Sequence, residues 1–135
     1  MWSGTYKIEQ CVRISGGGSS YCRFVLNGSL YIRLELVEQG QQISGEATLF
    51  NNLGTTVLER GNVTGQIEAS GELTLSGTTT SVTSDPATTH LAGWRSELTA
   101  EGRLAGRFTK NRTFTNAFGP QVSREECRLE ELSRQ

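Results

Sequence analysis

The side chains that could do chemistry are few in this chain, and their spacing does not bring them together. His90 is the only histidine and Asp85 the only aspartate among 135 residues. A metal centre needs three or four ligating side chains, and a nucleophilic triad needs a positioned base. We therefore expect no catalytic site, no metal and no cofactor. We predict that His90 is an exposed residue at the edge of a loop.

The three cysteines are Cys11, Cys22 and Cys127, and their odd count excludes a fully paired disulfide framework. No two of them have the C-x-x-C spacing of common zinc sites. Cys11 and Cys22 flank a glycine-rich turn, and they would face each other if the flanking segments paired as a hairpin. A Cys11–Cys22 disulfide, a Cys11–Cys127 disulfide and three reduced, partly buried cysteines all remain open.

Two pairs of carboxylates, Glu125–Glu126 and Glu130–Glu131, have a composition that suits general acid–base chemistry. Adjacent residues of a strand point to opposite faces, so we interpret both pairs as a solvated charged face. The run Ser15–Ser20 has the composition of a phosphate-binding loop, but no helix with Lys followed by Ser or Thr comes after it. We expect a hairpin tip there instead.

Charge and hydropathy exclude two classes of partner. Thirteen basic and fourteen acidic residues give a net charge of −1, and because these charges are dispersed we expect no nucleic-acid interface. No apolar run approaches the roughly 20 residues of a membrane-spanning helix, so we expect no transmembrane segment. Met1 is either the native start or the replacement for a removed leader, and we favour an exported protein over a cytoplasmic one.

The elements that must position any site are predicted to be short strands. A large apolar residue, a small residue and glycine occur in this order four times, ending at Gly4, Gly45, Gly65 and Gly106. Alternating residues follow each glycine, which would let a strand bend where a sheet curls onto itself. The predicted strand segments are 3–14, 21–26, 29–38, 42–50, 55–60, 63–69, 72–79, 90–99, 103–114 and 122–135.

Four segments leave choices open or break the alternation. Asn27-Gly28 predicts a type I′ turn or a bulge, and Gly61-Asn62 a turn or a bulge. Residues 78–89 contain Pro86 and predict a surface loop of about ten residues. Residues 122–135 begin with a capping-box pattern, but Cys127 and Leu129 alternate with charged residues. We favour a strand there, because the first strand would otherwise be an exposed edge.

Alternation also assigns the faces of the strands. In the first strand we expect the inward residues to be Tyr6, Ile8, Val12 and Ile14. In segment 90–99 we expect Ala92, Trp94, Ser96 and Leu98 to face inward.

Because a bulge at Asn27-Gly28 or Gly61-Asn62 would join neighbouring segments, the total is eight or nine strands, and sequential hairpins in that number predict an all-β fold. We expect one domain over residues 1–135, an eight-stranded antiparallel up-and-down β-barrel. A two-sheet β-sandwich is the alternative, but it needs longer crossing connections, and only residues 78–89 are long enough.

The strand plan and one short motif resemble the calycins, the group that includes lipocalins, fatty-acid-binding proteins and avidins. The motif is Gly4-Thr5-Tyr6, in which tyrosine replaces the tryptophan of the calycin Gly-x-Trp and Trp2 stands upstream. In calycins a basic residue of the last strand packs across this ring and seals the barrel end. The resemblance implies Arg124 or Arg128 for that role, and a barrel suited to a small ligand.

The inward face is apolar, and two interpretations of it remain open. It is either a filled core or a lumen, open at one end, that binds one apolar molecule. For the lumen we predict these ligand-binding residues: Tyr6, Ile32, Leu34, Ala47, Ile67, Leu75, Trp94 and Phe108.

Two functions follow from these interpretations. We favour a non-enzymatic barrel that carries a small apolar molecule in its lumen. The alternative is a structural or accessory module that docks on a larger protein assembly through its outer face, with Phe50, Phe114 and Phe118 as contacts.

Overall fold

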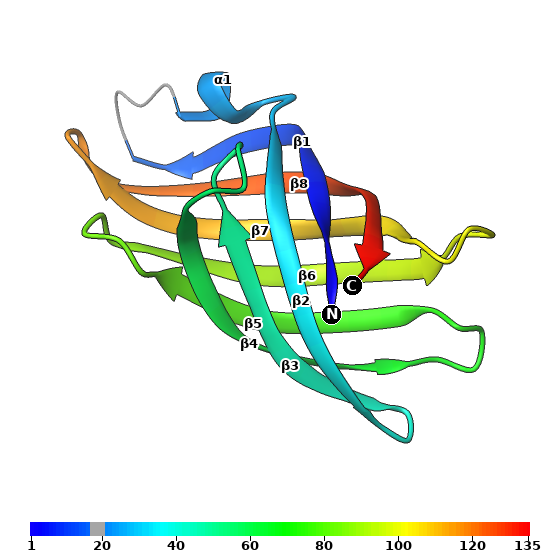
Figure 1. Cartoon of the computed structure of the whole chain (residues 1–135). Coiled ribbons are helices and arrows are strands. Elements are labelled where there is room, and N and C mark those ends of the chain that lie inside the picture. Colours follow the sequence, from blue (N-terminus) through cyan, green and yellow to red (C-terminus); the bar gives the residue numbers. More distant parts are fainter. Residues whose placement is uncertain (17–20) are drawn as a thin grey trace.

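A computed structural model describes residues 1–16 and 21–135, and in it the chain forms a closed barrel (Figure 1). Each of eight antiparallel strands pairs with the next, and β8 pairs with β1. The strands are β1 (Trp2–Ser15), β2 (Ser29–Gln39), β3 (Gln42–Phe50), β4 (Val57–Ile67), β5 (Leu73–Ser81), β6 (Ala87–Leu98), β7 (Leu104–Asn116) and β8 (Gly119–Arg134). A short helix, α1 (Tyr21–Val25), lies between β1 and β2. The predicted up-and-down barrel is confirmed, and the sandwich alternative is wrong.

The up-and-down order places the connections at two opposite ends of the barrel. One end, called the helix end, carries α1 and the connections 51–56, 82–86 and 117–118. The other, called the terminal end, carries the turns 40–41, 68–72 and 99–103 together with both chain termini. There the backbone N–H of Gln135 donates a hydrogen bond to the carbonyl oxygen of Met1 at 2.7 Å.

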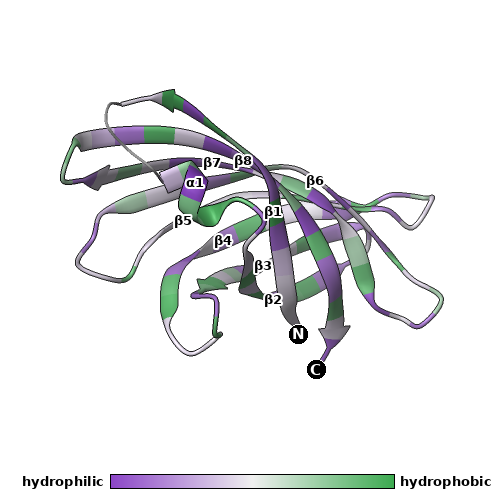
Figure 2. Ribbon diagram, turned by 90° about the horizontal axis from the view of Figure 1, so that it is seen from above, coloured by the Kyte–Doolittle hydropathy of each residue, from purple (hydrophilic) through white to green (hydrophobic). Residues whose placement is uncertain are grey.

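Apolar and polar residues alternate along the strands, as the alternating colours of Figure 2 show. The inward set forms one hydrophobic core, because residues two apart share a face of a strand. β8 belongs to this pattern, since Cys127 and Leu129 are buried while the strand pairs with both β7 and β1. The helix alternative for residues 122–135 is therefore wrong.

A β-bulge in β1 overturns part of the predicted facing of that strand. The register with β8 shifts between Ile8 and Gln10, and a bulge reverses the alternation that follows it. Cys11 then packs against the core. Val12 and Ile14 point outward and are 47% and 56% exposed, so their predicted inward position is wrong.

A second irregularity, in β6, buries Leu91, which the alternation did not predict to face inward. The pairing with β7 shifts between Ala92 and Arg95, and Gly93 between them has a φ of +57°, which glycine adopts readily. Leu91 and Trp94 are both buried as a result, whereas Ala92 is only partly buried and Leu98, at the rim, is 61% exposed. Trp94 and Ser96 face inward as predicted.

Segment 21–26, predicted as a strand, instead begins with the helix α1. Asn27 does adopt a positive φ, of 64°, but it does so where the helix ends rather than in a hairpin turn. The N–H of Gly28 donates to the carbonyl oxygen of Val25 at 2.9 Å at this helix terminus.

Two predicted interruptions of the sheet are shorter than expected or missing. Gly61 and Asn62 lie within β4 and keep the register of its pairing with β3, so they form neither a turn nor a bulge. The loop predicted at 78–89 shrinks to residues 82–86, because β5 and β6 extend into it. His90 is exposed as predicted, but it lies within β6 rather than at a loop edge.

Close approach of neighbouring strands explains three of the four repeated glycines. A Cβ at any of these three positions would overlap a backbone carbonyl oxygen of the adjacent strand. The overlapping pairs are Gly45 with Glu35, Gly65 with Thr74, and Gly106 with Arg95. A residue with a side chain would push these strands apart. The glycines therefore let the sheet coil tightly enough to close.

We expect Gly65→Ala to lower the free energy of unfolding by about 1–3 kcal/mol, because the new methyl group meets a backbone oxygen that is fixed in the β4–β5 ladder. Thr64→Ala is the control, since Thr64 is exposed on the opposite face of the same strand, and should cost less than about 1 kcal/mol. Urea unfolding measures both. Equal stability of Gly65→Ala and the parent protein would contradict the close-approach explanation.

Candidate functional site

The eight residues predicted to bind an apolar ligand all lie on the inward side of the barrel. Seven are at most 4% exposed, and Ile67 is partly buried. Phe108 stacks on Trp94 with ring centroids 4.6 Å apart and meets the ring of Tyr6 at 5.3 Å. The three rings pack together within the hydrophobic core, and contact of the eight residues with a ligand stays a prediction.

Toward the helix end the interior changes from apolar to charged. Lys110 and Glu125 are cross-strand partners on β7 and β8, and their side chains are 4% and 0% exposed. The Lys110 Nζ lies 3.2 Å from Glu125 Oε1 and donates to the hydroxyl of Tyr6 at 2.9 Å. The hydroxyl of Tyr21 donates to Glu125 Oε2 at 2.6 Å. A continuous polar chain thus runs from the aromatic core to α1.

A second buried ion pair lies beside the first. Arg112 Nε is 3.3 Å from Glu59 Oε2, and the Thr79 hydroxyl donates to Glu59 Oε1 at 3.0 Å. The guanidinium of Arg112 also lies over the rings of Tyr21 and Phe114, at 5.2 and 4.8 Å from their centroids. Two cations thus face two carboxylates, which offsets part of the cost of removing four charges from water.

The surroundings hold Tyr6, Lys110 and Cys127 each in one protonation state near neutral pH. Burial raises the pKa of Tyr6 to about 12, although the charge of Lys110 acts in the opposite direction. Burial has the largest single effect on Lys110 and acts to lower its pKa, but Glu125, Tyr6, Tyr21 and Cys127 together outweigh it, and the pKa lies well above its ordinary value. Burial also raises the pKa of Cys127 to about 12, so this thiol stays protonated and unreactive.

The two ion pairs, Lys110–Glu125 and Arg112–Glu59, are called here the charged layer. A disulfide fixes α1 over this layer. Cys11 of β1 is bonded to Cys22 of α1, with a Cα–Cα distance of 5.3 Å, and Cys127 is free and buried. This settles the pairing that the sequence left open. Cys11 is also the cross-strand partner of Glu125, so the disulfide anchors the helix where Tyr21 reaches Glu125. The predicted hairpin tip at 15–20 falls mostly on residues 17–20, which lie outside the described residues.

A cavity of about 250 Å³, called the mouth cavity, lies at the helix end between α1 and β8. Its lining residues are Arg13, Tyr21, Cys22, Phe114, Gln121, Val122 and Ser123. Ser123 is 2% exposed, and its hydroxyl has no hydrogen-bond partner among the described residues. The buried hydroxyl of Thr89 likewise has no partner among the described residues, and Thr89, Arg112 and Ser123 are successive cross-strand neighbours on β6, β7 and β8. A buried hydroxyl without a partner in the described part of the chain therefore stands in the wall of this cavity.

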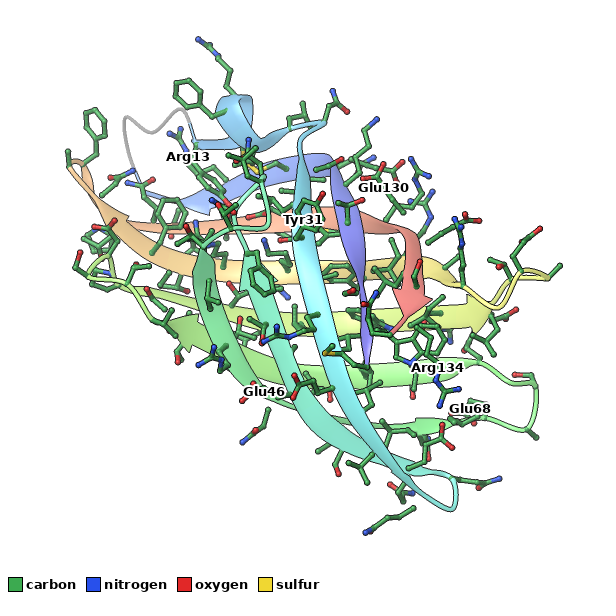
Figure 3. The ribbon with its side chains drawn as sticks, in the orientation of Figure 1. Arg13, Tyr31, Glu46, Glu68, Glu130 and Arg134 are labelled. Atoms are coloured by element: carbon green, nitrogen blue, oxygen red, sulfur yellow. A yellow bond between two sulfur atoms is a disulfide. The ribbon has the colours of Figure 1, made fainter. Side chains whose placement is uncertain are left out.

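A second cavity, of about 300 Å³, opens at the terminal end and is mostly apolar. Its walls include Trp2, Ile67, Leu98 and Arg134. The guanidinium of Arg134, labelled in Figure 3, lies 5.8 Å from the centroid of the Trp2 ring. A basic residue of the last strand thus covers an aromatic ring of the first.

The resemblance to calycins implied Arg124 or Arg128 as the basic residue that packs over an aromatic ring of the first strand. That expectation is wrong. Arg124 forms an exposed ion pair with Glu126, with nitrogen and oxygen 3.6 Å apart. Arg128 Nε lies 3.1 Å from Glu9 Oε2 on the outer face. Both side chains point away from the aromatic rings, because they are out of phase with the inward residues of β8.

The charged layer was missed in the sequence, although its signal was present. Lys110 and Arg112 continue the two-residue spacing that Phe108 begins, and Glu125 is in phase with the buried Cys127. The interpretation of Glu125–Glu126 as a solvated face is wrong for Glu125, which is fully buried. The charge of these residues suggests exposure, whereas their phase along the strand indicates the interior.

The three phenylalanines proposed for docking lie in different surroundings. The ring of Phe50 is partly buried, with the guanidinium of Arg33 5.4 Å from its centroid. Phe114 packs against Tyr21 with ring centroids 4.6 Å apart. Phe118 alone of the three is well exposed, at 65%.

We expect thermal stability to fall as pH rises above about 9. The pKa values of Cys127 and Tyr6 are about 12 in the folded protein, against ordinary values of 9.0 and 10.0. An unfolded chain releases these protons first, so their contribution is complete below the ordinary pKa and is lost as pH rises toward 12. Melting temperatures from pH 7 to 11 test this, with Tyr6→Phe as the comparison. A flat profile for the parent protein would contradict it.

We expect Lys110→Met to cost about 3–5 kcal/mol of unfolding free energy, because it leaves the Glu125 carboxylate buried without its cation. Adding Glu125→Gln should recover most of this loss, since the amide oxygen still accepts from Tyr21. Arg107→Met, which removes an exposed partner of Glu9, is the control and should cost at most about 1 kcal/mol. Urea unfolding gives all three values. A double variant as unstable as Lys110→Met would show that the two charges do not depend on each other.

Among the described residues, no three His, Cys, Asp or Glu side chains gather as a metal site, and no described helix is long and apolar enough to cross a membrane. Comparisons with protein-family models, with curated proteins and with solved structures give no match. The site is therefore interpreted from its own geometry, that of an eight-stranded antiparallel barrel with a charged interior at one end.

Proposed function

We propose that this protein is a non-enzymatic binding protein that holds one small ligand at the helix end of its barrel. The observation that carries the proposal is the Ser123 hydroxyl, which is 2% exposed, unpartnered among the described residues and set in the wall of the mouth cavity. Buried polar groups in native proteins nearly always have a hydrogen-bond partner. A polar group of a ligand would supply the one that is missing here.

The walls of the cavity favour an amphipathic ligand. Arg13 contributes a positive charge, Ser123 a hydroxyl, and Tyr21 and Phe114 the faces of two rings. This set suits an anionic or hydrogen-bond-accepting head joined to an apolar body. The volume of about 250 Å³ limits the enclosed part to a small molecule or to the end of a longer one.

The apolar body of such a ligand would point toward the predicted lumen residues. The first ring beyond the charged layer is that of Tyr6, whose hydroxyl accepts from Lys110. Deeper entry, to the predicted contacts Trp94 and Phe108, requires their stacked rings to separate. The proposal therefore places the polar head in the mouth cavity and leaves the depth of entry to the length of the apolar body.

The barrel plan supports a calycin-like carrier. In calycins a basic residue of the last strand covers an aromatic ring of the first and seals that end, and the packing of Arg134 over Trp2 is similar. In this comparison the terminal end corresponds to the sealed end of a calycin barrel, and the helix end corresponds to its open end. Because one fold hosts many functions, the proposal relies on the mouth cavity and takes only the direction of entry from this likeness.

We expect protein purified from its own source to carry a small molecule that native mass spectrometry detects as an added mass. Decanoate, an anionic head on a short apolar chain, is the probe for protein freed of that molecule. It should bind with one-to-one stoichiometry, and Ser123→Ala should weaken binding about tenfold through the lost hydrogen bond. Isothermal titration calorimetry measures the affinity.

Thr113→Ala is the matched control, since Thr113 is exposed near the same end of β7. It should leave decanoate binding unchanged. Bare protein in the mass spectrum, together with equal decanoate affinity for Ser123→Ala and the parent protein, would contradict a ligand site at Ser123 and would leave water as the partner of this hydroxyl.

A further inference from the structure

Exposed apolar side chains gather at the helix end, and every connection there contributes one. Phe24 of α1 is 81% exposed, Leu53 in the β3–β4 connection 70%, Val82 in the β5–β6 connection 51%, and Phe118 in the β7–β8 connection 65%. Isolated apolar residues on a surface are ordinary. One on each of the four connections at the same end of the barrel is a defined arrangement, and these four side chains are called here the apolar tips.

Charge is distributed unequally between the two ends. The turns of the terminal end carry Glu68, Glu72 and Glu101 against Arg103, and Arg134 of β8 lies at the same end (Figure 3). Figure 3 labels Glu68 at that end and Arg13 beside α1 at the other. The helix end carries Arg13 and exposed Arg23 near the tips, and Asp85 is the one carboxylate in its connections. An anionic surface would therefore attract the helix end more strongly than the terminal end.

From these two observations we infer that the helix end docks on an anionic lipid surface, with the four apolar tips inserted among the lipids. The tips come from separate connections at one end of the barrel, so each can enter a fluid interface without a matching pocket. A protein partner would instead require a continuous, complementary face. Basic residues close to such a surface strengthen binding to anionic lipids. Arg23, which is exposed and precedes Phe24 in α1, would contribute in this way.

Docking in this orientation also turns the mouth cavity toward the lipid. An amphipathic ligand could then pass between bilayer and barrel without crossing water. This part rests on the proposed function, whereas docking itself depends on Phe24, Leu53, Val82 and Phe118, none of which lines the cavity. Lipid docking and ligand binding can therefore fail independently.

The test is partition of the full chain onto vesicles of phosphatidylcholine alone and of phosphatidylcholine mixed with phosphatidylserine, measured by co-sedimentation. We expect binding that is stronger to the mixed vesicles and declines as salt is added. Phe24→Ser combined with Phe118→Ser should lower the partition coefficient at least tenfold. Arg23→Gln should lower it about fivefold on the mixed vesicles and leave neutral vesicles unaffected.

Val37→Ser is the matched control, because Val37 is 59% exposed near the terminal end. It removes a comparable apolar side chain and should not change partition. All of these residues are exposed, so the variants should fold, which circular dichroism checks. Ser123→Ala should bind vesicles as the parent protein does even if it fails to bind decanoate.

Three results would overturn the inference. One is the absence of binding to either kind of vesicle, and another is equal loss of partition in Val37→Ser and the double variant. The third is a stable dimer in sedimentation velocity that Phe24→Ser with Phe118→Ser abolishes while vesicle binding is absent. The tips would then form an interface between two copies of the chain.

Discussion

The pairing of β8 with β1 is the constraint on which the rest of this structure depends. It removes the free edges that an open sheet would expose, and it turns one face of every strand into a shared interior. It also gives Glu125 two cross-strand partners, Lys110 on β7 and Cys11 on β1. The ion pair and the anchor of the disulfide therefore meet at one carboxylate, and that meeting exists only because the sheet closes.

Closure divides the interior into zones with different physical roles. In the middle, stacked aromatic rings supply the apolar burial that stabilises a small domain. At the helix end two ion pairs occupy space that apolar side chains could fill, usually with equal or greater stability. These charges lie next to a cavity and to the Ser123 hydroxyl, which has no hydrogen-bond partner among the described residues, and the proposed function starts from that combination.

Alternation in the sequence predicted the barrel and most of its inward residues, and the reasons for its failures are physical. It could not reveal the extra residue of a bulge, which turned Val12 and Ile14 outward. Near Asn27 the requirement for positive φ was recognised, but a helix end meets it as well as a hairpin does. The candidate site was missed because hydropathy places charged residues outside, whereas the strand phase of Lys110 and Glu125 places them inside. The mouth cavity depends on α1, which local patterns did not predict.

The adjacency of the two chain termini has a consequence for attachment. The hydrogen bond between Gln135 and Met1 holds the N- and C-terminal residues side by side, at the end of the barrel opposite α1 (Figure 1). A fusion partner, affinity tag or surface linker joined to either residue emerges from that end. Immobilised in this way, the barrel presents its helix end outward to the surrounding solution. A linker that joined the two termini would likewise run across the far end and leave the opening uncovered.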